Sequence, residues 1–196
     1  MSPESRAFEY ALGIFAVLIG LAVADIASSF HKLLRSKSPV RWDPLALLAA
    51  AYALCMAVYM WFDIWGVRHF SLTRHFFFYI GLVGQLFILY LIAAASLPDE
   101  TGDPTDLREF YAGNRRHLWS LMTLFQFFYC AFGVYFSGGE SATLPTLIAV
   151  WLRVQMLLPL IISLALLAMK SRTTHYLGLA ALIVIMVLHY GSAVID

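Results

Sequence analysis

Six apolar segments of roughly 20 residues follow one another along the chain, with short polar stretches between them. They cover residues 8–30, 44–65, 76–96, 118–137, 146–168 and 176–195. A helix needs about 20 apolar residues to cross the hydrocarbon core of a bilayer. None of the segments shows the alternation of apolar and polar residues that is typical of membrane β-barrel strands. The pattern predicts an all-α, polytopic membrane protein, a bundle of about six transmembrane helices that forms a single domain over residues 1–196.

The connection between the third and fourth segments is the longest, and its sequence changes character along its length. It begins with the acidic, turn-prone stretch LPDETGDPTD and continues as DLREFYAGNRRHLW. Asp106 followed by Glu109 resembles a capping box, which marks the start of a helix. We therefore expect a short amphipathic helix on the cytoplasmic interface before the fourth span, with Arg115 and Arg116 at the level of the lipid headgroups.

The composition and the positions of the basic residues set the class and the orientation. Hydrophobic residues make up 61% of the 196 residues and charged residues 13%, which is outside the range of soluble domains. The net charge of +1 leaves no basic surplus for binding nucleic acid. Nine Lys and Arg residues lie in loops one, three and five, against three on the other side. The positive-inside rule then predicts a multi-pass plasma-membrane protein with both termini outside.

Small residues recur at helical spacing on the first two segments. They are Ala16, Gly20, Ala24 and Ser28 on the first segment and Ala46, Ala50, Ala53 and Ala57 on the second. Small side chains let helix backbones approach closely in lipid. We therefore expect these two faces to meet inside the bundle.

Ionisable residues within the spans are the strongest candidates for function, because they are costly in lipid. At similar outer depth lie Glu9, Asp63, Arg153 and His189. This outer cluster is either an anion or proton site or a structural ion pair between Arg153 and Asp63. Near the midplane lie Gln85, Gln126 and Gln155, with Gln155 beside the kink expected from Pro159. The three glutamines form either a solute path or polar cross-links between helices.

Asp25 is the inner counterpart of the outer cluster. Two interpretations are open: a proton relay from Asp25 to His31, or an ion pair between Asp25 and either Arg115 or Arg116. We favour the ion pair.

Cofactor and enzyme motifs are weak in this sequence. A b-type haem needs two histidines at equal depth on separate spans, and only His189 lies clearly within one. The sequence has no nucleophile elbow, Walker loop or GxGxxG fingerprint, and no HxxxH pair for zinc. We expect neither a metal nor a cofactor and favour a non-enzymatic role.

Several short motifs resemble those of a known group of proteins. SLPDE, DLREFY and NRRHLW in the long loop, with GLAVADIASSFHKLLR in the first span, are similar to a family of uncharacterised bacterial six-helix inner-membrane proteins. The resemblance covers most of the chain. It implies the six-helix topology and the bacterial inner membrane, and it implies no activity.

Two functions remain compatible with these residues. The first is a small channel or transporter for an ion, a proton or a small solute, with its polar cluster in the outer half of the bundle. The alternative is an accessory, sensory or assembly subunit that binds other membrane proteins. The expected partners are the lipid bilayer and either a second copy of the chain or other membrane subunits.

Overall fold

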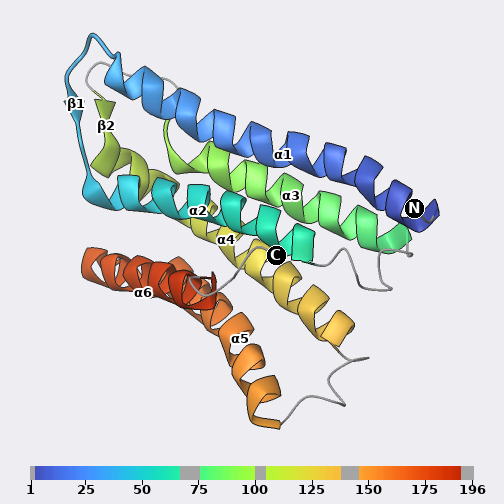
Figure 1. Ribbon diagram of the computed structural model, residues 1–196. Helices are drawn as coiled ribbons and strands as arrows, with labels where there is room; N and C mark the ends of the chain where they lie inside the picture. The colour runs from blue at the N-terminus through green and yellow to red at the C-terminus, as the bar shows by residue number, and fades with distance from the viewer. Residues whose placement is uncertain (1–2, 67–75, 100–104, 138–145, 191–196) are drawn as a thin grey trace. The chain divides into compact units, whose positions relative to one another are not determined.

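The computed structural model describes residues 3–66, 76–99, 105–137 and 146–190 (Figure 1). Side chains are described within 8–66, 76–99, 105–133 and 157–189. The elements are α1 (Pro3–Leu34), β1 (Val40–Arg41), α2 (Pro44–Gly66), α3 (Phe76–Ser96), β2 (Thr105–Asp106), α4 (Leu107–Ser137), α5 (Thr146–Ala168) and α6 (Arg172–Tyr190). The prediction of an all-α protein is confirmed, and each predicted segment overlaps one helix.

Four of the helices are long and apolar enough to cross a bilayer among the residues described. They are Phe8–Leu34 within α1, Pro44–Gly66, Phe76–Ser96 and Arg172–His189 within α6. Large apolar side chains such as Val17, Phe77 and Leu177 point outward and are exposed. Lipid rather than water suits such a surface, so the chain has the character of a helical membrane protein.

The amphipathic segment before the fourth span does not form a helix of its own. Residues 107–137 form the single helix α4, which at 1.5 Å per residue is about 46 Å long. No proline interrupts this helix, and Gly113 lowers the stability of the helix by only about 1 kcal/mol relative to alanine. The amphipathic stretch is therefore the first part of α4.

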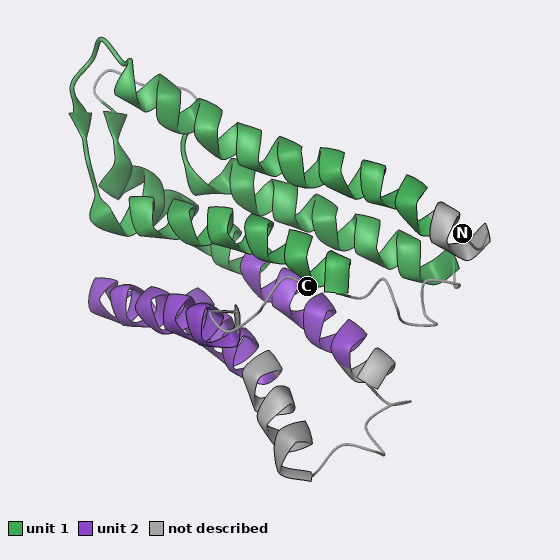
Figure 2. Cartoon of the chain, in the orientation of Figure 1, with its two compact units in different colours: residues 1–121 green, residues 122–196 purple. Residues whose placement is uncertain are grey.

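The chain divides into two compact units (Figure 2). Unit 1 spans Met1–Leu121 and unit 2 spans Met122–Asp196, so α4 contributes to both. That the whole chain forms a single domain stays a prediction.

The core of unit 1 is a bundle of α1, α2 and α3 (Figure 1). Two contacts show that α1 and α3 run in the same direction. Phe15, in the first half of α1, stacks on Tyr79 near the beginning of α3, with ring centroids 6.4 Å apart. At the other end, the Ser29 hydroxyl donates a hydrogen bond to Asp99 just beyond α3. Because α2 connects the two, it runs antiparallel to both.

The small residues behave differently on the first two helices. On α2, the predicted stripe of Ala46, Ala50, Ala53 and Ala57 is buried, as expected. On α1, Gly20, Ala24 and Ser28 are exposed and Ala16 is half-buried, so the prediction for this face is wrong. The reason is that α1 packs through a different face. Its buried residues at helical spacing are Phe15, Ile19, Ala22, Ile26, Ser29 and Leu33, four of which are large.

A small parallel bridge joins the first and third loops of unit 1. Val40 pairs with Thr105 and Arg41 pairs with Asp106 in β1 and β2. The Arg41 guanidinium also lies 3.6 Å from the Asp106 carboxylate. The two loops therefore lie at the same end of the bundle.

Asp106 begins α4 as its N-cap, which confirms the expected cap at this position. Its Oδ1 accepts the backbone N–H groups of Arg108 at 2.8 Å and Glu109 at 3.2 Å. These N–H groups have no partner within the helix, so the carboxylate satisfies them. The N–H of Glu109 lowers the pKa of Asp106 most; the N–H of Arg108 and the charge of Arg41 lower it further, and desolvation partly opposes them.

This lowered pKa predicts a specific acid sensitivity. Because the pKa of Asp106 is lower in the folded protein than in the unfolded chain, its carboxylate stabilises the fold at pH values above about 4. That stabilisation is lost as the pH falls through the folded pKa. Asparagine at position 106 can still cap the helix but does not titrate. We therefore expect the melting temperature of Asp106→Asn to fall less than that of the wild type as the pH is lowered. An equal fall in both proteins would contradict the role given to Asp106.

In unit 2, α5 and α6 form a helical hairpin. The helices approach closely at Gly178, where an added Cβ would lie 2.7 Å from the terminal methyl groups of Leu166. At the turn, the buried His175 ring has its Nε2 3.1 Å from the Met169 carbonyl oxygen. This histidine therefore helps to close the connection between α5 and α6.

Candidate functional site

A charged cluster lies where α1 and α3 end together. The Ser29 hydroxyl donates to Asp99 Oδ1 at 3.0 Å. The Lys32 ammonium donates to the Asp99 carbonyl oxygen at 3.3 Å and lies 3.6 Å from Asp99 Oδ1. Ser29 is buried, whereas the side chains of Lys32 and Asp99 are about half exposed. The cluster therefore extends from the solvent to the packed surface between the two helices.

Asp25 continues this cluster into the apolar part of α1. Asp25, Ser29 and Lys32 are spaced four and three residues apart, so they share one face of the helix. Asp25 is half-buried and interacts electrostatically with both Asp99 and Lys32. Two carboxylates and one ammonium give the group a formal charge of −1. Such a group can accept a proton or attract a small cation.

Asp99 is the member of this cluster that sequence reasoning missed. It lies in the turn-prone stretch after the third span, where acidic residues are usually solvated. Two features of the sequence could have identified it: Asp99 lies three residues after the third predicted span, and Lys32 lies two residues after the first. The predicted topology places both ends on the same side of the membrane.

The other residues predicted for the inner site occupy different positions. His31 is exposed and lies six residues from Asp25, which places it on a different face of α1 at about 100° per residue. Arg115 is half-buried and Arg116 is exposed in the first part of α4. An ion pair between Asp25 and either arginine stays a prediction.

Gln85 is the most buried of the predicted midplane glutamines that the structure describes. It lies near the middle of α3, where its side chain is 4% exposed. Its amide Nε2 has no hydrogen-bond partner among the described residues. A buried amide without a partner costs roughly 1–3 kcal/mol, so this position favours a water molecule or a polar solute. Gln126 in α4 is also buried, and the side chain of Gln155 lies outside the described residues.

The residues predicted for the outer cluster are divided between the two units. Glu9 is exposed on α1 and Asp63 is half-buried on α2, both in unit 1. His189 is half-buried on α6 in unit 2, and the side chain of Arg153 lies outside the described residues. The outer cluster stays a prediction.

Comparison with known proteins adds no assignment. No family model matches the chain, and no curated protein or solved structure is detectably similar to it. Within the described part of the chain, no three His, Cys, Asp or Glu residues are grouped so that they could hold a metal ion.

Proposed function

We propose that this chain is a six-span inner-membrane protein of the bacterial family that its loop motifs resemble, and that it is a small channel or transporter for protons or other small cations. The cluster of Asp25, Ser29, Lys32 and Asp99 carries this proposal. It places a carboxylate within an apolar helix, and intramembrane carboxylates commonly mark ion and proton paths.

The remaining two spans of the proposal are α4 and α5. The part of α4 beyond Leu118 is apolar and long enough to cross a bilayer, and so is α5 with its 23 residues. The pairing of the first and third loops supports an arrangement in which both lie on the cytoplasmic side. The many basic residues of these loops favour that orientation.

The proposed path runs inward along α1 and α3. Asp25 lies seven residues from Lys32, which is about 10 Å along the helix axis. Gln85 lies about 16 Å from the end of α3, near the middle of a hydrocarbon core that is about 30 Å thick. The Nε2 of Gln85, which has no hydrogen-bond partner in the described part of the chain, offers a polar group at the depth where crossing is most costly. We include the outer residues Glu9 and Asp63 of unit 1 as the opposite end of this path, and the part of Arg153 and His189 stays a prediction.

Proton flux into vesicles tests the proposal. Purified protein is placed in liposomes that contain a pH-sensitive dye, and proton entry is measured under an applied potassium diffusion potential. We expect the wild type to conduct protons and Asp25→Asn to lose most of this flux, because an amide cannot bind and release the proton. Asp106→Asn is the matched control, since Asp106 is a carboxylate outside the apolar helices, and its flux should equal that of the wild type.

Two results would contradict transport or the role of Asp25 in it. Folded wild-type protein that carries neither protons nor potassium above the level of protein-free vesicles would refute transport. The accessory role, in which the chain binds other membrane proteins, would then be preferred. Equal losses in Asp25→Asn and Asp106→Asn would show that Asp25 has no special part in the path.

A further inference from the structure

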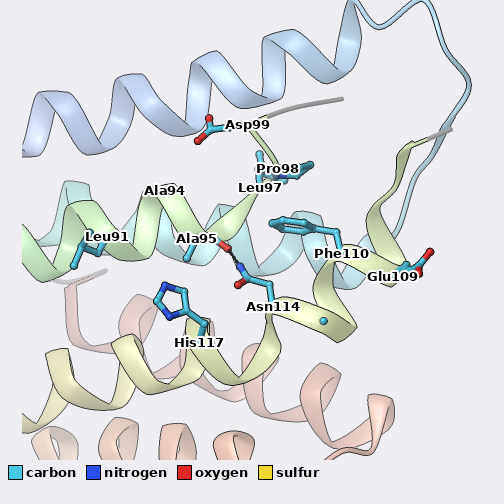
Figure 3. A pocket seen from close by; sticks show the side chains of 11 residues that line it. Leu91, Ala94, Ala95, Leu97, Pro98, Asp99, Glu109, Phe110, Asn114 and His117 are labelled. Carbon is cyan, nitrogen blue, oxygen red and sulfur yellow. Dashed lines mark hydrogen bonds between the residues drawn. The ribbon is translucent and has the colours of Figure 1, made fainter. Parts of the chain in front are cut away.

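A pocket of about 670 Å³ opens between the end of α3 and the beginning of α4, within unit 1. Its α3 wall is apolar and includes Leu91 and Ala94, whereas its α4 wall carries Phe110, Asn114 and His117 (Figure 3). Its volume falls within the range of about 300–1,000 Å³ that is typical of small-molecule sites. The pocket is thus large enough for the headgroup and glycerol of a lipid.

The pocket crosses the boundary of the apolar region. Leu91 lies five residues before the end of α3, about 8 Å inside the apolar helix. Asp99 lies beyond that end, and Glu109 lies in the first turn of α4. The lining therefore changes from apolar to charged in the direction that leads out of the hydrocarbon core. An amphipathic molecule matches this change.

Two polar side chains of α4 face the end of α3 inside the pocket. Asn114 donates one amide N–H to the Ala95 carbonyl oxygen, with Nδ2 and O 2.6 Å apart. His117 lies three residues further along α4, on the same side of the pocket (Figure 3). The second N–H of Asn114 and an imidazole N–H are hydrogen-bond donors that suit phosphate oxygens.

The charges at the rim favour a cationic group on the same molecule. The carboxylate of Asp99 is held by Ser29 and Lys32 on the side of α1. Glu109 at the outer edge is exposed, and among the described residues its side chain makes no hydrogen bond or ion pair. Its carboxylate points away from Asn114 and His117 in Figure 3 and, being exposed, can rotate towards a bound headgroup. An ammonium group would complement this carboxylate.

We propose that this pocket binds a phospholipid with a primary amine headgroup, such as phosphatidylethanolamine. The ammonium pairs with Glu109, and the phosphate accepts hydrogen bonds from Asn114 and His117. The glycerol and the first methylene groups of the acyl chains lie along Leu91 and Ala94. This site does not depend on the proposed transport activity, because lipid retention can be measured without flux.

Gly113 allows the pocket to be filled without a clash. It lines the pocket, and an added Cβ would meet no atom within 4 Å. Gly113→Leu therefore fills the space and also replaces a poor helix former. Gly84→Leu is the matched control, because Gly84 is an exposed glycine of α3 with equally open surroundings and lies outside the pocket lining.

Native mass spectrometry of the full chain in detergent measures the binding. Delipidated protein is mixed with equal amounts of dioleoyl phosphatidylethanolamine, phosphatidylcholine and phosphatidylglycerol. We expect the wild type and Gly84→Leu to retain phosphatidylethanolamine about tenfold more than the other two, a difference equal to one charge-assisted hydrogen bond. Gly113→Leu should lose this retention, and Glu109→Gln should reduce it to the level of phosphatidylcholine, whose quaternary amine cannot donate a hydrogen bond.

Three results would overturn the proposal: equal retention of the three lipids by the wild type, preferential retention of phosphatidylglycerol, or undiminished retention by folded Gly113→Leu. Should Gly113→Leu fail to fold, Glu109→Gln decides the question, because Glu109 is an exposed side chain whose amide replacement keeps its shape. Unchanged selectivity in that variant would also overturn the proposal.

Discussion

Replacing Trp119 by alanine is expected to destabilise the protein by about 3–5 kcal/mol, the usual cost of removing a buried tryptophan. The Trp119 side chain in the first part of α4 is fully buried. Its Nε1 also donates a hydrogen bond to the Tyr111 hydroxyl oxygen, with the two atoms 3.0 Å apart. The substitution therefore leaves a large cavity and removes this hydrogen bond to the Tyr111 hydroxyl. Thermal or denaturant unfolding in detergent, followed by circular dichroism, measures the loss.

Two further variants separate the two causes. Tyr111→Phe removes the hydrogen-bond acceptor but keeps the ring, so we expect a loss of only about 1–2 kcal/mol. Trp119→Phe keeps most of the volume and should lie between Tyr111→Phe and Trp119→Ala. If Trp119→Ala melted at the same temperature as the wild type, this part of α4 would not belong to the part of the protein that unfolds cooperatively.

Gly178→Leu is expected to have the second largest effect, a loss of about 1–3 kcal/mol from overpacking. The added Cβ would lie 2.7 Å from the two terminal methyl groups of Leu166. Leu166 is only 1% exposed, so its side chain can turn aside only by displacing its neighbours in the packed interior. We expect this repacking, or a small separation of α5 and α6, to cost stability. The melting temperature in detergent measures this loss.

Leu166→Ala provides the compensating change for Gly178→Leu. Alone, it should destabilise the protein by leaving a cavity, but in the double variant the new leucine occupies that space. We expect the double variant to be more stable than the sum of the two single losses predicts. Gly13→Leu is the control, since its Cβ would meet no atom within 4 Å. Additive losses in the double variant, or an equal loss in Gly13→Leu, would refute the close approach at Gly178.

Most helix positions could be predicted from the chain because their causes are local. The third predicted span, residues 76–96, coincides with α3, and the second differs from α2 by one residue. Asp43 and Pro44 at the start of α2 are typical N-cap and N1 residues, and these preferences act within a single turn. The start of α4 was less accurately predicted. The residues before Leu118 are too polar to continue the apolar pattern, but they are still part of the helix.

Which helix face is buried was predictable only in part. The alanines of α2 lie inside the bundle, whereas Gly20 and Ala24 of α1 are exposed. Small residues permit close packing in lipid but do not require it, because apolar faces cost little there whichever way they point. The rotation of α1 is set by its contacts with α3, such as Phe15 on Tyr79.

The sequence alone determined the all-α architecture, the number of apolar segments and the cap at Asp106, since each follows from residues close together along the chain. Only the tertiary structure decided that Asp99, rather than another residue, joins Ser29 and Lys32, and that Val40 and Arg41 pair with Thr105 and Asp106. These partners are about 65–70 residues apart, and their spacing leaves no periodic pattern in the sequence. They meet because α1 and α3 run in parallel and end together, which depends on how three helices pack.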